Sequence, residues 1–181
     1  FRSANYNTWD IPQVGCGYLA VQSKTGPFAM DHPNGKLMRQ ALSHAIDKEA
    51  IHQAIFNGLS ESLNGFYGTA SSWHMPDIKN IKEYDPEKSK AILRKLNAMN
   101  TPVAVVARQA YSYMHQTGEI VYSMLEEAGF KVTNEVFDNP VLRKKYKKSD
   151  YGVDSTANSY RFEPDQWYSV NVLSSGPSTK L

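Results

Sequence analysis

One stretch constrains the fold more than any other, because it holds two strand patterns with a helix pattern between them. Residues 102–107 form a continuous apolar run, which is typical of a strand buried on both faces. The spacing of apolar residues then predicts a helix over 112–128, and residues 130–136 alternate as a half-buried strand does. A strand, a helix and a strand at this spacing form a βαβ unit with parallel strands and a right-handed crossover. The sequence therefore predicts an α/β fold built as a layered sandwich.

The other predicted elements surround this unit. An apolar residue at every third or fourth position predicts one long helix over 36–57, with its apolar stripe in the core. Asp85 and Pro86 suit the cap and the first position of a helix that ends near Asn97. Residues 60–81 form a long connection, and connections of this length are often functional. The remaining predictions are strands over 17–23 and 151–157, a loop over 24–35, a basic helix over 140–148 and a last helix over 164–173.

Composition excludes several classes of protein. The 181 residues carry a net charge of +2 and contain no apolar run long enough to span a membrane as a helix. The one cysteine, Cys16, cannot form an internal disulfide, and the five histidines lack zinc-site spacing. There is no nucleophile elbow and no phosphate-binding glycine loop, so we expect no catalytic residues, no resident metal and no cofactor. The basic run 143–148 is interpreted as a solvated helix face, without nucleic-acid binding.

Two loops combine aromatic rings with polar side chains. One is 71–74, which contains Trp73 and His74, and the other is 159–168. The second follows the carboxyl end of a predicted strand, where open α/β sheets place their ligands. Rings with a few converging polar groups are typical of pockets for small molecules. We therefore expect a solute site at these loops.

Several blocks of the sequence resemble, in order, blocks of the family 5 solute-binding proteins. These are the extracytoplasmic receptors of ABC importers for peptides, nickel and related solutes. The most specific block is 26–51, where GPF and LMRQALSHAIDKEAI resemble the family's "PF-D-RVRQALSYAIDREAI". Residues 84–93 resemble "YDPEKAKALL", and residues 125–132 resemble "L-K-x-G-I-x-V". Residues 150–152 and 163–165 fall where the family has "gdyD" and "DPD".

The resemblance implies one lobe of a bilobed receptor with the type II periplasmic-binding-protein fold. Residues 1–17 would be an irregular arm or an interlobe segment, and 18–181 a single lobe. Such a receptor is not an enzyme: it closes on a peptide-like or anionic small solute and delivers it to ABC permease subunits. We expect a periplasmic or extracytoplasmic monomer whose signal peptide lies outside these residues. The expected ligand-binding residues are Trp73, Tyr160, Arg161 and Trp167.

One departure from the family bears on the solute. Peptide-binding members resemble "W-x-x-D" before the "EP" or "DP" pair, and that Asp grips the peptide's ammonium. Here Ala157 stands at the Trp position and Tyr160 at the Asp position, and a neutral phenol cannot replace a carboxylate. Arg161 next to it suits a bidentate contact with an anionic group. Two alternatives stay open: a nickel or metallophore receptor that uses His74, and an enzyme on an α/β scaffold.

Overall fold

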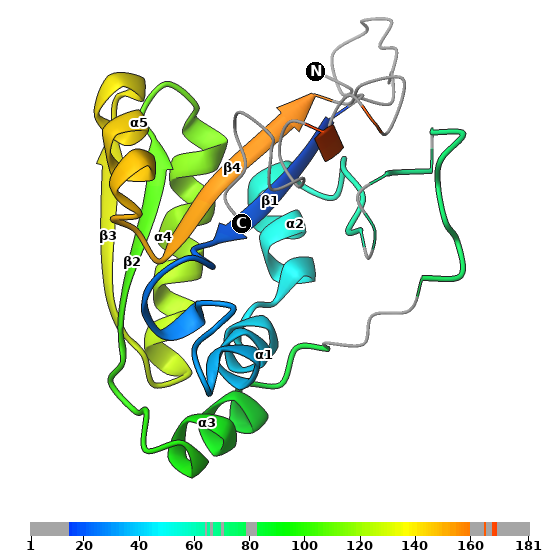
Figure 1. The fold of residues 1–181 in the computed structure, drawn as a ribbon. Coiled ribbons are helices and arrows are strands. Elements are labelled where there is room, and N and C mark those ends of the chain that lie inside the picture. Colours follow the sequence, from blue (N-terminus) through cyan, green and yellow to red (C-terminus); the bar gives the residue numbers. More distant parts are fainter. Residues whose placement is uncertain are drawn as a thin grey trace, which may run out of the picture.

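The computed structural model describes residues 15–63, 65, 67–69, 71–78, 83–159, 165, 168 and 169. Within these residues four strands form one sheet in the order β1-β4-β2-β3 (Figure 1). Strand β2 runs parallel to β3 and β4, and β1 runs antiparallel to β4. The strands are β1 (Gly15–Val21), β2 (Pro102–Arg108), β3 (Lys131–Phe137) and β4 (Val153–Ser159).

The predicted βαβ unit is confirmed as β2, helix α4 (Ser112–Glu127) and β3. The chain then returns through α5 (Asn139–Lys148) to β4, on the other side of β2. The two helices cover opposite faces of the sheet, because Val105 packs in the cluster that includes α4 while its neighbour Val106 packs against α5. The connections from β2 and β3 thus leave the sheet toward opposite faces, which is the arrangement that creates a ligand-binding crevice at the carboxyl ends of parallel strands.

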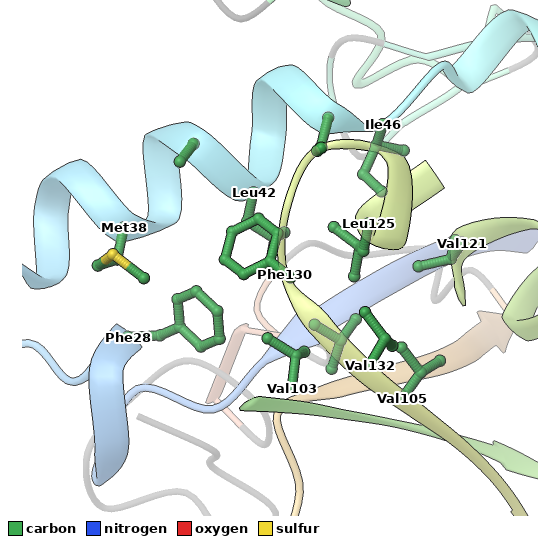
Figure 2. Packing of buried hydrophobic residues seen from close by; sticks show 14 of the residues in the cluster. Phe28, Met38, Leu42, Ile46, Val103, Val105, Val121, Leu125, Phe130 and Val132 are labelled. Atoms are coloured by element: carbon green, nitrogen blue, oxygen red, sulfur yellow. The ribbon is translucent and has the colours of Figure 1, made fainter. Parts of the chain in front are cut away.

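The main core lies between the sheet, α4, α1 (Gly35–Ala45) and the short helix η1 (Gly26–Phe28). Figure 2 shows Phe28 of η1 and Leu42 of α1 turned toward Phe130, the residue just before β3. The Phe28 and Phe130 ring centroids are 6.3 Å apart. Valines of β2 and β3 and apolar residues of α4 complete this layer, namely Val103, Val105, Val132, Val121 and Leu125.

The prediction of a single helix over 36–57 is wrong, because the chain breaks between α1 and α2 (Lys48–Phe56). Ile46 is extended, with φ −99° and ψ 115°, and the Asp47 carboxylate accepts a hydrogen bond from the Ala50 backbone N–H. A short polar side chain that bonds its own backbone in this way starts a new helix instead of continuing the old one. The apolar stripe is fully buried only in α1 and at Ile46 after it, since no residue of α2 is fully buried and its Ile51 packs against the core while partly exposed. Because of this break α2 is a separate helix, and it borders the site described below.

The predicted loop over 24–35 contains the short helix η1 with its buried Phe28, and the other described elements agree with their predictions to within two residues. Helix α3 (Pro86–Lys95) is capped by the Asp85 carboxylate, which accepts from the Lys88 N–H at 2.9 Å. Strand β1 begins at Gly15, so residues 15–17 join the sheet and not the predicted arm. The predicted last helix, over 164–173, lies almost wholly outside the described residues. No helix among the described residues is both long and apolar enough to cross a membrane.

Gly35, the first residue of α1, lies against the backbone next to η1. A methyl group at Gly35 would lie 2.0 Å from the Ala29 carbonyl oxygen, so the backbone would have to move. We expect Gly35→Ala to lower the free energy of unfolding by about 1–3 kcal/mol in urea denaturation. Gly17→Ala is the matched control, because its methyl group would meet no atom within 4 Å. Equal stabilities of the two variants would contradict this close approach.

Candidate functional site

A pocket of about 520 Å³ lies between α2 and the connection that follows it. Helix α2 contributes Glu49 and His52, which are three residues apart and therefore lie on one side of the helix. The pocket holds both polar and apolar side chains, as small-molecule sites do. We call it the loop pocket, and its lining residues are Glu49, His52, Ser60, Glu61, Ser62, Leu63, Gly65, Tyr67, Thr69, His74, Met75, Pro76 and Ile78.

Polar contacts give the loop pocket its shape. His52 Nδ1 lies 2.9 Å from the Ser60 hydroxyl, which ties the loop to α2. His74 Nδ1 lies 2.9 Å from the Tyr67 carbonyl oxygen, so this ring nitrogen is the one that carries the proton. The Glu61 carboxylate accepts from both the hydroxyl and the backbone N–H of Thr69, and these bonds lower the pKa of Glu61. The pocket thus presents two carboxylates, Glu49 and Glu61, and two oriented imidazoles.

A second group of side chains lies at the carboxyl end of β2. We call it the edge cluster, and it comprises Phe56, Arg108, Tyr111 and Tyr113. The Tyr113 ring centroid is 6.2 Å from that of Phe56 and 6.1 Å from that of Tyr111. Tyr113 is close enough to Arg108 for the guanidinium charge to act on its phenol, although burial raises the pKa of Tyr113 overall. Phe56 is four residues after His52, so one side of α2 borders both the loop pocket and the edge cluster.

Neutral groups hold the Arg108 guanidinium in place. It donates to the Thr156 hydroxyl at 2.5 Å and to the Tyr146 hydroxyl at 3.0 Å, and Tyr146 in turn donates to the Asp154 carboxylate at 2.7 Å. Desolvation and the nearby Asp154 charge raise the pKa of Tyr146, so the Tyr146 side chain stays a protonated, neutral phenol. In the part of the chain that the structure describes, no carboxylate forms an ion pair with Arg108. Arg108 therefore holds a fixed positive charge at the carboxyl end of β2, with its central carbon 5.8 Å from the centroid of the Tyr146 ring.

Two further tyrosines lie on the Asp154 side of the sheet. The Tyr18 hydroxyl accepts from the Asn158 side-chain amide at 3.0 Å, and the Tyr151 ring packs edge-on against Tyr146 with 5.4 Å between centroids. Burial, followed by the charge of Asp154, raises the pKa of both Tyr18 and Tyr151 to about 12. The folded protein therefore keeps these two phenols neutral above the pH at which free tyrosine ionises.

These tyrosines make stability fall at alkaline pH. The unfolded phenols ionise near pH 10, whereas the folded ones stay protonated to about pH 12. The stabilisation is therefore complete below pH 10 and is lost as the pH rises through 12. Urea midpoints measured at increasing pH should fall across this window, and Tyr151→Phe should make the fall shallower. A slope that is the same in the parent and in Tyr151→Phe would contradict this prediction.

The structure tests few of the predicted site residues directly. Trp73 lies in the loop with 47% of its surface exposed, and its ring is not among the lining residues of the loop pocket. Its neighbours His74 and Met75 do line the pocket. Tyr160, Arg161 and Trp167 lie outside the described residues, so their roles stay predictions.

Sequence reasoning missed Arg108 and the rings around it. The signal was present, because Arg108 directly follows the strand predicted over 102–107, at the edge where parallel sheets bind ligands. His74 was considered as a ligand for nickel. Among the described residues, no three His, Cys, Asp or Glu side chains lie together in a way that could hold a metal ion. The nickel alternative therefore gains no support from this loop.

A family model matches nearly the whole chain. Residues 2–180 match the model described as "Bacterial extracellular solute-binding proteins, family 5 Middle". The chain belongs to this family. The resemblance seen in the sequence motifs is therefore confirmed, and with it the α/β lobe of the type II periplasmic-binding-protein fold. Family 5 is a family of transport receptors and not of enzymes.

Individual relatives show how the chain compares in length. It is 29% identical over 94 residues to the dipeptide-binding protein of Escherichia coli K12, which covers 52% of this chain and 16% of that protein. It is 25% identical over 166 residues to heme-binding protein A of Haemophilus influenzae, covering 89% and 28%. The structure of NikA from Brucella suis in complex with Fe(III)-EDTA matches with a TM-score of 0.81 at 14% identity, covering 99% of this chain and 38% of that one. The chain thus spans less than a third of the length of these two curated relatives.

Proposed function

We propose that this chain forms one lobe of an extracytoplasmic receptor that captures a small solute and delivers it to an ABC permease. The residues before β1 connect this lobe to the rest of the receptor. Closure of a second lobe over the carboxyl edge of the sheet creates two states of the receptor, which the permease distinguishes. The receptor acts as a monomer and breaks no bond in its solute.

The observation that carries this proposal is the Arg108 guanidinium at the carboxyl edge, fixed by Thr156 and Tyr146. A planar cation with several N–H donors is suited to a carboxylate or another anionic group. We propose that Tyr113, on whose phenol the Arg108 charge acts, and Tyr111 add aromatic surface at this edge, and that the loop pocket takes the remainder of the solute. The solute class is therefore a peptide-like or other small molecule with an anionic group.

We also propose that the site residues predicted from the sequence contact the solute. Arg161 is a second cation for the anionic group, and Tyr160 and Trp167 are further ring contacts with the solute. Trp73 has the exposure that a residue needs to meet a solute or the second lobe. Because the phenol of Tyr160 replaces a carboxylate, an ordinary peptide with a free ammonium is the less suitable ligand.

A thermal-shift screen of the full-length protein tests the proposal. The panel contains peptides with free and amidated C-termini, opines, sugars and metal chelates. One class with an anionic group should raise the melting temperature in a concentration-dependent way, as ligand linkage requires. Stabilisation by neutral sugars alone, or by no class at all, would contradict the proposal. Turnover of ester or phosphate substrates would favour the enzyme alternative instead.

A further inference from the structure

Helix α5 carries a dense group of positive charges on its outer side. Its inner side is fixed by Leu142, which is 1% exposed, and by the Tyr146 hydroxyl that donates to Asp154. The residues one and two positions after Leu142 and after Tyr146 lie on the opposite side of the helix and are exposed to solvent. We call this surface the basic face, and its residues are Arg143, Lys144, Lys147 and Lys148.

The charges of the basic face are not neutralised locally. Among the residues that the structure describes, Lys145 is the one member of α5 that forms ion pairs, with Glu135 and Asp150, each at 3.2 Å. Among the described residues, no carboxylate pairs with the four residues of the basic face. Five of the chain's twenty Lys and Arg residues lie in this helix, so the other fifteen are outnumbered by eighteen Asp and Glu residues. The positive charge of the chain is therefore concentrated at one place.

We infer that the basic face docks the receptor on an anionic lipid surface. Flexible lysines act as mobile point charges, which suits a fluid layer of headgroups better than a fixed protein partner. Nucleic acid fits less well, because the nearby rings of Tyr146 and Tyr151 pack against each other and do not offer a stacking surface. Val141, which is 39% exposed on the same helix, adds a small apolar contact for the membrane interface.

The position of α5 is compatible with solute binding at the same time. Figure 1 shows α5 beside β3, on the opposite side of the molecule from α2 and the loop that follows it. A membrane held at the basic face therefore leaves the loop pocket uncovered. This inference goes beyond the proposed function, since lipid binding needs no solute and can be measured without one.

Vesicle co-sedimentation of the full-length protein tests the inference. We expect binding to vesicles of phosphatidylcholine with about one quarter phosphatidylglycerol at low salt, and much weaker binding to phosphatidylcholine alone. The double variant Lys144→Gln/Lys148→Gln should bind the anionic vesicles about 25-fold more weakly, at about fivefold for each charge. The matched control is Lys88→Gln/Lys95→Gln, which removes the same charge from exposed positions on α3 and should lose little of the binding.

Three results would overturn this inference. Equal binding to both kinds of vesicle would show that charge is not recognised. An equal loss in the α3 control would show that only the net charge matters. Binding to polyglutamate or DNA without binding to anionic vesicles would assign the basic face to another class of partner.

Discussion

Replacing Arg108 by methionine is expected to weaken binding of the solute identified in the screen by about 10- to 100-fold. The change keeps the length of the side chain and removes the cation that the edge cluster presents to an anionic group. Hydrogen bonds to charged groups contribute about 1.5–3 kcal/mol, which corresponds to this range. The Tyr146 hydroxyl would still donate to Asp154, so the buried Asp154 carboxylate keeps this hydrogen bond in the variant. Isothermal titration of the full-length variant measures the effect.

Arg94→Met on α3 is the control for Arg108→Met. Arg94 is exposed on a helix that does not line the loop pocket or the edge cluster, and its loss should leave affinity unchanged. Urea denaturation of both variants separates a lost solute contact from a general loss of stability. Unchanged affinity in Arg108→Met, with a folded protein, would remove Arg108 from the site.

Leu125→Ala is expected to have the largest effect on stability. Leu125 lies on α4, is 0% exposed and packs within the main core under α1. Truncating such a leucine removes buried apolar surface and leaves a cavity that the neighbours fill only in part. The free energy of unfolding should fall by about 2–5 kcal/mol, as measured from urea denaturation curves.

The matched control for Leu125→Ala is Leu59→Ala. Leu59 is 73% exposed, so the same truncation there removes little buried surface. Its free energy of unfolding should stay within about 0.5 kcal/mol of the parent. A similar loss in both variants would contradict the placement of the core between α1, α4 and the sheet.

Burial patterns explain which parts of the fold the sequence predicts. The run 102–107 and the alternation in 130–136 are visible because strand burial dictates residue type directly. The break after Ala45 was missed because Lys, Glu, Ala and Ile on either side all suit a helix. Only the Asp47 cap, a local contact that competes with the helix, reveals where α2 begins.

The candidate site was less predictable than the fold. An aromatic residue in a long loop can face either the pocket or solvent, and Trp73 is exposed while His74 and Met75 line the loop pocket. Loop orientation depends on contacts such as that of His52 with Ser60, which residue type alone does not specify. Arg108 is a different case, because its place at the carboxyl end of a buried strand is predictable from the topology.

We propose that the carboxyl edge of the sheet is this lobe's part of the solute site. Hydrogen–deuterium exchange of the full-length protein, with and without the solute from the screen, tests it most directly. Solute should slow exchange in the second half of α2, in residues 71–78 and in residues 109–115, while α3 stays unchanged. Protection confined to α3 or the start of β3, with none at the carboxyl edge, would contradict the claim.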